Sequence, residues 1–306
     1  MQSVFCIGHA VQDLVFSIDE IPTRAIKYNA SSFETIGGGP AATAAVAISK
    51  LGGSASLASR VGDDILADFI ISELKSYGVD CSLVKRIEGK QSSTSTVLID
   101  NAGERMIINF QDSSLNPDIK WLKEKFVLDT TAVLADTRWP EAAVHVFKLA
   151  KQKGIPAVLD ADIPVPKDGE LVNAATHVAF SEYGLIEFTG IKNVESALQS
   201  VHERFGNCCC VTLGSRGLII IDDGKQSYFP AFNINVRDTL GAGDVWHGAF
   251  SLALAEGKDT INAVMFASAA AALKVQNGGG RAGCPSRENV DSFLQLHYEA
   301  KKSYVT

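Results

Sequence analysis

Short apolar runs alternate with longer amphipathic stretches along most of the 306-residue chain. Strands that alternate with helices form βαβ units, so this rhythm predicts an α/β fold with a mostly parallel sheet covered by helices on both faces. The predicted strands are residues 4–8, 54–61, 131–136, 157–160, 177–180, 208–213 and 217–222. The predicted helices are residues 41–51, 63–77, 141–151, 194–204 and 242–256.

Two segments break this rhythm, because residues 15–33 and 90–110 have strand-like patterning with no helix between their strands. In the second segment, SSTSTVLID and RMIINF flank a DNAGE turn, which is typical of a β-hairpin. We expect a small β-sheet lid formed by about residues 12–36 and 88–112, inserted in the α/β body. No linker-like tract or internal repeat divides the chain, so one domain over 1–306 is predicted.

Charge and hydropathy exclude several classes of partner. The chain has 28 basic and 35 acidic residues, a net charge of −7, which argues against nucleic acid because phosphate binding favours a basic face. No window approaches eighteen consecutive apolar residues, so no membrane partner is expected. The N-terminal residues lack the features of a signal peptide and read as a first strand.

The six cysteines include three in succession, Cys208, Cys209 and Cys210, inside an apolar run. Neighbours on a strand point to opposite faces, so these three side chains cannot close on one metal ion. We expect buried, reduced thiols and a cytoplasmic location. A structural role is also expected for His9 and His247, although both flank predicted site segments.

The most informative stretch is DTLGAGD at 238–244, which precedes a helical pattern. Small residues at a helix start leave backbone N–H groups accessible, and the helix dipole adds partial positive charge there, so Gly241, Ala242 and Gly243 predict an anion hole. Asp244 beside the hole is suited to take a proton from an attacking hydroxyl. The physics alone leaves an alternative open, a helix capped after a glycine turn.

DTLGAGD resembles the second signature of the ribokinase-like (PfkB) carbohydrate kinases, and Gly37-Gly38-Gly39-Pro40-Ala41-Ala42 resembles their first signature region. The resemblance covers essentially the whole chain. It implies a three-layer αβα sandwich with a β-sheet lid, and an enzyme that transfers phosphate from ATP to a sugar hydroxyl.

The resemblance also implies roles for individual residues. Asp244 would be the catalytic base, and the amides of 241–243 would bind the transferred phosphate. Asp13 would hold sugar hydroxyls, and Gly38 and Gly39 would let the backbone approach the sugar and act as a lid hinge. The implied nucleotide-binding residues are Thr212, Gly214, Ser215, Gly217, Ala269, Asn277 and Gly280.

The chain departs from the family pattern at two places. Many relatives carry an Asn-x-x-Glu motif where Ser181 and Gly184 stand, and an Asn that helps to bind sugar where Ala42 stands. No metal-ligand spacing is present, so the only metal we expect is magnesium carried with ATP. The resemblance further implies a homodimer.

Three polar residues suggest the substrate. Lys27, Asn109 and Arg138 come from regions that the family fold would bring around the far end of the sugar, and together they suit a tetrahedral anion. The pattern resembles the 6-deoxy-6-sulfofructose kinases of sulfoquinovose breakdown, in which a Lys, an Asn and an Arg hold the sulfonate. Phosphorylation of the C1 hydroxyl is then implied. The matching stretches are KY at 27–28, GGGPAATAAVA at 37–47, GERMIIN at 103–109, LADTRW at 134–139, AFSE at 179–182 and GGRAG at 279–283.

Other functions remain open. A ketohexokinase or fructokinase, or a kinase for an acidic keto-sugar, would fit the same motifs, and each residue of the cage taken alone is also consistent with a solvated surface group. An NAD-dependent Rossmann dehydrogenase is a remote alternative, because 37–42 and 278–283 fit dinucleotide fingerprints but do not follow the first strand. A sugar sensor without activity is a third alternative, and intact DTLGAGD argues against it. A classical P-loop is absent from the sequence.

Overall fold

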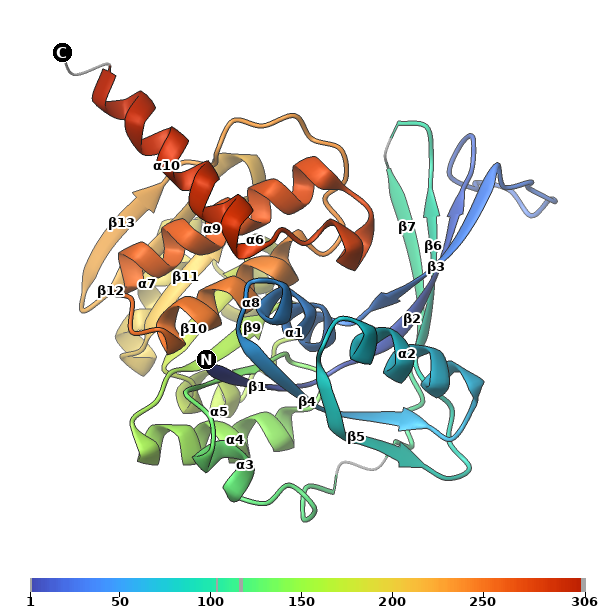
Figure 1. The fold of residues 1–306 in the computed structure, drawn as a ribbon, viewed down its shortest axis with the longest axis horizontal. Helices are drawn as coiled ribbons and strands as arrows, with labels where there is room; N and C mark the ends of the chain where they lie inside the picture. Colours follow the sequence, from blue (N-terminus) through green and yellow to red (C-terminus); the bar gives the residue numbers. More distant parts are fainter. Residues whose placement is uncertain (1, 103, 116–117, 304–306) are drawn as a thin grey trace.

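The computed structural model describes residues 2–102, 104–115 and 118–303, and it contains a nine-stranded and a four-stranded sheet (Figure 1). The large sheet consists of β1 (Ser3–Ile7), β4 (Ser54–Gly62), β5 (Asp80–Ile87), β8 (Ala132–Ala135), β9 (Ala157–Ala161), β10 (His177–Ser181), β11 (Cys208–Thr212), β12 (Leu218–Asp222) and β13 (Lys225–Phe229). The helices are α1 (Pro40–Lys50), α2 (Ile65–Ser76), α3 (Lys125–Leu128), α4 (Pro140–Lys153), α5 (Glu170–Ala174), α6 (Glu182–Thr189), α7 (Val194–Phe205), α8 (Ala242–Ala255), α9 (Thr260–Asn277) and α10 (Arg287–Ser303), with 3₁₀ turns η1 (Gly214–Arg216) and η2 (Gly280–Gly283).

The strand order of the large sheet fixes where a ligand can bind. The order is β13-β12-β11-β10-β9-β8-β1-β4-β5, and all neighbours are parallel except the pairs β11–β12 and β12–β13. β1 pairs with β4 on one side and with β8 on the other, so the chain reverses its direction across the sheet at β1. In open α/β sheets, ligands bind at such a switch point, outside the carboxyl ends of the strands.

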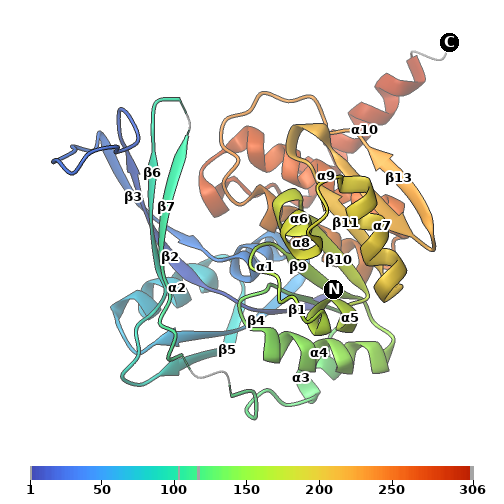
Figure 2. The same ribbon diagram turned by 180° about the vertical axis from the view of Figure 1, so that it is seen from behind.

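Helices cover both faces of the large sheet, as Figures 1 and 2 show from opposite sides. One apolar core packs α1, α8 and α9 against the sheet, and a second core packs α4 and α7 against the other face. Cys210 belongs to the first core and Cys209 to the second, so adjacent thiols do lie on opposite faces, and all six cysteines are free. Burial raises the pKa of Cys209 to about 12, which keeps the thiol protonated and inert.

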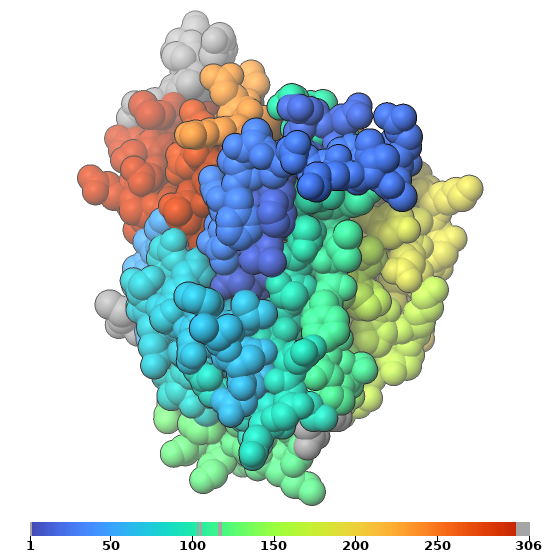
Figure 3. Space-filling model, turned by 90° about the vertical axis from the view of Figure 1, so that its right-hand side faces the viewer, coloured from blue at the N-terminus to red at the C-terminus, as the bar shows by residue number. Residues whose placement is uncertain are grey.

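The lid is the four-stranded sheet, with the order β3-β2-β6-β7. Its strands are β2 (Val11–Ser17), β3 (Ser32–Gly38), β6 (Thr94–Ile99) and β7 (Arg105–Phe110). The pairs β2–β3 and β6–β7 are antiparallel, and β2 and β6 run parallel. Figure 3 looks onto the side of the molecule formed by these blue and teal segments. The predicted small second sheet and its hairpin are confirmed, and its action as a lid remains a prediction. Gly103 of the predicted turn lies outside the described residues.

The three-layer architecture and every predicted strand and helix are confirmed, with ends that differ by up to two residues. The strands β5 and β13 at the two edges of the large sheet were not predicted. Both are partly exposed and carry polar residues at many positions, so their apolar pattern is weak. Over the described residues, no helix combines the length and apolar content that crossing a bilayer requires.

Candidate active site

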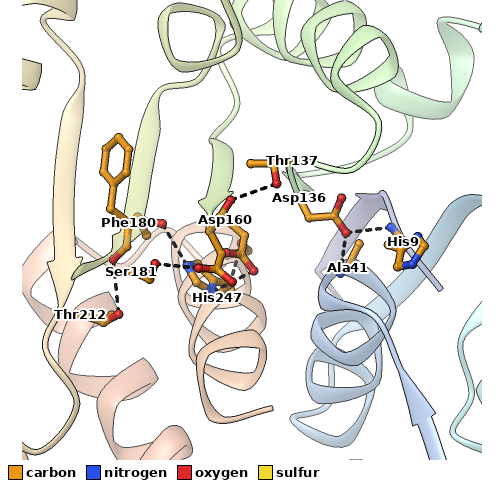
Figure 4. A network of polar contacts seen from close by, with 12 residues as sticks. His9, Ala41, Asp136, Thr137, Asp160, Phe180, Ser181, Thr212 and His247 are labelled. Carbon is orange, nitrogen blue, oxygen red and sulfur yellow. Dashed lines mark hydrogen bonds and ion pairs between the residues drawn. The ribbon is translucent and has the colours of Figure 1, made fainter. Parts of the chain in front are cut away.

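Polar side chains gather where β1, β8, β9 and β10 end, facing the N-termini of α1 and α8 (Figure 4). These strand ends include the switch point between β1 and β8, where the topology favours a ligand. Helix N-termini carry partial positive charge and free N–H groups, so the same place favours an anion. The site is therefore set by the topology as well as by its motifs.

Asp136, directly after β8, ties three segments together. Its Oδ2 accepts hydrogen bonds from the backbone N–H groups of His9 at 2.8 Å and Ala41 at 3.1 Å, and its Oδ1 accepts one from the backbone N–H of Arg138 at 2.8 Å. The side chain is buried, with 2% of its residue surface exposed. Asp136 thus joins the end of β1, the start of α1 and the segment that carries Arg138.

His247 lies one turn after Asp244 on α8, beneath the site. Its Nε2 lies 3.3 Å from the carbonyl oxygen of Ala179, and its Nδ1 lies 3.3 Å from a carboxyl oxygen of Asp160 without a hydrogen bond of good geometry (Figure 4). Burial lowers the pKa of His247 and raises that of Asp160 well above its usual range, so burial disfavours the charged forms of both. The predicted structural role of His247 agrees with this buried position.

Ser181 and Gly184 occupy the positions of the missing Asn-x-x-Glu motif. The Ser181 hydroxyl donates to Asp162 at 2.7 Å and accepts from the backbone N–H of Gly184 at 3.0 Å, so Ser181 caps α6. Ser181 thus combines a local helix cap with a hydrogen bond to Asp162, the residue directly after β9, at the place where many relatives have Asn-x-x-Glu.

The DTLGAGD segment forms the predicted turn at the start of α8. Gly241 is the N-cap residue with φ of 73°, and no side chain caps the helix. A β-carbon added at Gly243 would meet no atom within 4 Å, so the turn is open on that side. An open helix N-terminus without a side-chain cap can bind an anion through its backbone N–H groups.

Asp244 lies in the first turn of α8. Burial, together with the negative charge of nearby Asp160, raises the pKa of Asp244 to about 7. A carboxylate with this pKa is well matched to proton transfer near neutral pH.

Asp13 on β2 is buried against the end of β3. A β-carbon at Gly38 would lie 2.1 Å from Asp13 Oδ2, and one at Gly39, where φ is 95°, would lie 2.4 Å from the His9 carbonyl oxygen. Only glycine fits at these two positions. Burial raises the pKa of Asp13, while a hydrogen bond from Ser95 and the charge of Arg281 oppose the rise.

Arg281 of η2 is a buried cation at the end of the loop 277–281, a loop that the resemblance places on the adenine side of the nucleotide. Its guanidinium donates to the Gly38 carbonyl at 2.6 Å, to Thr43 Oγ1 at 3.3 Å and to Glu73 Oε2 at 2.7 Å. Burial lowers the pKa of Arg281, and the nearby charges of Glu73, Asp13 and Asp244 oppose this fall. Arg281 therefore connects the predicted lid hinge with the loop that follows α9.

The three predicted anion ligands come from separate elements. Asn109 on β7 is in register with Ser95 on β6, which is in register with Asp13 on β2, so Asn109 and Asp13 lie on one face of the lid. Arg138 is half-buried beside Asp136, and its charge acts on His9 and Asp160. Lys27 lies exposed in the loop between β2 and β3.

The predicted nucleotide residues follow the strands farther along the sheet. Thr212 ends β11 and donates its hydroxyl to Phe180 O at 3.3 Å, Gly214 and Ser215 lie in η1, Gly217 follows η1, and Gly280 begins η2. The structure does not favour two of the expected nucleotide contacts. Ala269 on α9 is fully buried in the core, so it has no surface for adenine. The side-chain amide of Asn277 already donates to the carbonyl oxygen of Gly283 at 3.0 Å.

Asp136 and Lys274 were not predicted as site residues, and Arg281, expected on the adenine side, contacts Gly38 and Glu73 instead. The sequence does mark such residues, because each is a single charge among apolar or small residues, as in Asp136 after VLA and Lys274 after AAAAL. Such charges are rarely buried without a partner. Among the described residues, no cluster of three or more His, Cys, Asp or Glu could hold a metal ion.

Fold and site together define an α/β protein with an open helix N-terminus, an adjacent carboxylate and a lid, an arrangement suited to small-molecule phosphotransferases. The family model of the pfkB family carbohydrate kinases matches residues 1–287, and the chain belongs to this family. This membership leaves the dehydrogenase alternative without support, and Gly37 indeed lies on a lid strand and not after β1.

Relatives cover nearly the whole chain. The ribokinase of Bacillus subtilis (strain 168) is 28% identical over 296 residues, 96% of this chain and 100% of that protein. A crystal structure from Agrobacterium tumefaciens, provisionally named a ribokinase, is 37% identical with a TM-score of 0.93, covering 97% of this chain and 99% of that one. Arabidopsis thaliana ribokinase, solved with ribose and ATP, is 25% identical with a TM-score of 0.85 over 96% and 98% of the two chains.

Proposed function

We propose that this carbohydrate kinase transfers the γ-phosphoryl group of ATP to the C1 hydroxyl of 6-deoxy-6-sulfofructose, giving the 1-phosphate and ADP. The observation that carries the proposal is the position of Arg138. Asp136 binds its backbone beside the switch point, and Asn109 lies on the same lid face as Asp13. The guanidinium of Arg138, the side-chain amide of Asn109 and the ammonium of Lys27 would together donate hydrogen bonds to a tetrahedral anion.

The reaction follows from the groups around α8. The Asp244 carboxylate takes the proton of the C1 hydroxyl while that oxygen forms a bond to the γ-phosphorus. The bond from the γ-phosphorus to the β,γ-bridging oxygen breaks, and ADP leaves. The amides of Gly241 and Gly243 bind the phosphoryl oxygens as charge develops on them, and the Ala242 amide joins them by exchanging its hydrogen bond to the Thr239 carbonyl. Asp13 holds sugar hydroxyls, and the pKa of about 7 makes Asp244 an effective base near neutral pH.

ATP is proposed as the donor because a relative was solved with ribose and ATP. The 3₁₀ turns η1 and η2 carry three of the residues expected to bind the nucleotide, Gly214, Ser215 and Gly280. Magnesium would arrive bound to the ATP phosphates and neutralise their charge. A cytoplasmic location is proposed on the same grounds as before, the free and buried thiols.

The test is a panel of sugars with coupled detection of ADP. The panel contains 6-deoxy-6-sulfofructose, fructose, fructose 6-phosphate, a carboxylated keto-sugar and ribose, the last because relatives are named ribokinases. We expect the highest kcat/KM for sulfofructose. A preference for fructose, the carboxylated sugar or ribose would replace the proposed substrate with that one.

The Arg138→Ala variant sharpens this test. Loss of charged hydrogen bonds worth about 2 kcal/mol should lower kcat/KM for sulfofructose roughly 30-fold, with less than about a threefold change for fructose. Arg24→Ala, in the exposed loop that also carries Lys27, is the matched control and should change neither value. Equal losses on both sugars would show that Arg138 has only a structural role.

We further propose a homodimer through the lid. Phe33, Ile108 and Phe110 are 56%, 60% and 45% exposed, and by strand register they lie on the lid face opposite Asp13 and Asn109. Exposed apolar surface of this kind favours association. Ile108→Glu should convert dimer to monomer in light scattering, and Ile65→Glu, at an equally exposed position on α2, should not.

A further inference from the structure

Lys274 is a fully buried lysine that the proposed mechanism does not use. It lies near the C-terminal end of α9, with 0% of its surface exposed, among residues that are otherwise mostly small and apolar. Burying an ammonium ion costs several kcal/mol unless it is paired and hydrogen-bonded. A lysine in this position therefore requires a specific partner.

The partner is Asp238, the first residue of the DTLGAGD segment. Lys274 Nζ lies 3.0 Å from Asp238 Oδ2 and 3.4 Å from the Asp238 carbonyl oxygen. The backbone N–H of Asp238 also donates to the carbonyl of Val275 at 3.1 Å. Asp238 is thus held by α9 through its side chain, its carbonyl and its N–H.

The side chain of Asp238 also fixes the backbone directly before the anion hole. Its Oδ1 accepts a hydrogen bond of 2.8 Å from the backbone N–H of Leu240, the residue directly before Gly241. The N–H of Ala242 donates to the carbonyl of Thr239 at 3.2 Å. The amides at the start of α8 are therefore oriented by a turn whose first residue is fixed by Lys274.

The charge of Lys274 has a second consequence. The Asp238 carboxylate accepts its hydrogen bond from Leu240, directly before the anion hole, so its negative charge acts against an incoming phosphate. The ammonium ion neutralises that carboxylate from the protein interior, where the effective dielectric constant is low and charges interact strongly. The dipoles of the hole then act on the phosphate without an opposing charge beside them.

We propose that Lys274 is a positioning residue for phosphoryl transfer, an internal cation that fixes Asp238, orients the turn at 239–243 and cancels the adjacent negative charge. This proposal deepens the proposed function and rests on the anion hole assigned there. A purely structural ion pair would change the stability of the protein without changing turnover per folded molecule, so the two roles are separable.

The first test compares Lys274→Met, which removes the charge and keeps most of the length, with Lys151→Met on the exposed face of α4 as the matched control. Kinetic constants are normalised to the folded fraction from circular dichroism. We expect kcat of the Lys274 variant to fall at least about 30-fold, with KM for the sugar within about threefold. A kcat within threefold of the unaltered enzyme would overturn the proposal.

Chemical rescue supplies a readout that a structural role would not move. In a further variant, Lys274→Ala, propylammonium chloride should raise kcat severalfold, because this cation has the size of the removed part of the side chain and can pair with Asp238. Tetramethylammonium chloride, which cannot donate a hydrogen bond, controls for ionic strength. Stimulation by neither salt, or equally by both, would contradict the positioning role.

A double variant covers the case in which Lys274→Met does not fold. Lys274→Met combined with Asp238→Asn buries no unpaired charge, so it should remain folded. Its kcat should lie about tenfold below that of the unaltered enzyme, because the hold on Asp238 is lost although the repulsion is removed. A double variant as fast as the unaltered enzyme would refute the proposal.

A binding measurement separates this proposal from the choice of substrate. Calorimetry of ATP and ADP without sugar reports how well the hole binds the γ-phosphate, and the ATP preference should fall at least about fivefold in the charge-removing variants. If the unaltered enzyme phosphorylates no sugar of the panel, the proposed substrate fails, while an unchanged or a reduced ATP preference still decides the role of Lys274.

Discussion

Asp136→Asn tests whether one buried carboxylate organises the sugar side of the site. The carboxylate accepts backbone hydrogen bonds from His9, Ala41 and Arg138, on two different oxygens. The amide that replaces it keeps one oxygen and presents an N–H group where the other oxygen was. At least one of the three backbone N–H groups then faces the N–H donors of the new side-chain amide and loses its buried acceptor.

The magnitude follows from these three bonds. A hydrogen bond to a charged acceptor contributes about 1.5–3 kcal/mol, and one to a neutral acceptor about 0.5–1.5 kcal/mol. Loss of one charged bond and weakening of two others amounts to roughly 4 kcal/mol. At about 2 °C per kcal/mol for a domain of this size, Tm should fall by roughly 8 °C.

The assay combines thermal denaturation with kinetics on two sugars. Because Asp136 holds the backbone of Arg138, kcat/KM should fall more for the anionic sugar than for fructose. Asp129→Asn, at an exposed position after α3, is the control and should change Tm by less than about 1 °C. A change in Tm below about 2 °C for Asp136→Asn, with unaltered kinetics on both sugars, would refute the role assigned to this carboxylate.

Three further predictions concern the base, the buried arginine and the lid. Because the base must be ionised, log kcat/KM should rise by one per pH unit up to the Asp244 pKa of about 7 and then level off, and a pH-independent profile would contradict this. Asp244→Asn should lower turnover at least about 100-fold with little change in Tm. Glu73→Gln leaves the buried Arg281 without its carboxylate and should cost about 3 kcal/mol in urea denaturation, whereas the exposed Glu88→Gln should cost almost nothing; equal midpoints would be contrary evidence. Sugar binding should slow hydrogen exchange in residues 88–112, and unchanged exchange would argue against lid closure.

The sequence was sufficient for the architecture because the relevant signals are local. Buried parallel strands are continuous apolar runs, and the hairpin 94–110 shows its own turn, so neither needs tertiary information. The edge strands β5 and β13 were missed because exposure removes that pattern. The DTLGAGD turn was found for the same local reason, as helix start and glycines lie within seven residues.

The rest of the site depends on contacts between distant residues. Arg281 contacts Glu73 and Gly38, which are 208 and 243 positions away, and Asp136 contacts Ala41 across 95 positions. No local pattern encodes such pairs. Ala269 shows the converse error, because a small residue on a helix is compatible both with a ligand surface and with the core, and here it lies in the core.

The most direct measurement is a crystal structure with 6-deoxy-6-sulfofructose and a non-hydrolysable ATP analogue bound together. The predicted result has a carboxylate oxygen of Asp244 within about 3 Å of the C1 hydroxyl, the γ-phosphate at the amides of 241–243, and the sulfonate bound by Lys27, Asn109 and Arg138. A sugar bound with its C1 hydroxyl beyond reach of Asp244, or a γ-phosphate away from the start of α8, would contradict the assignment of the active site.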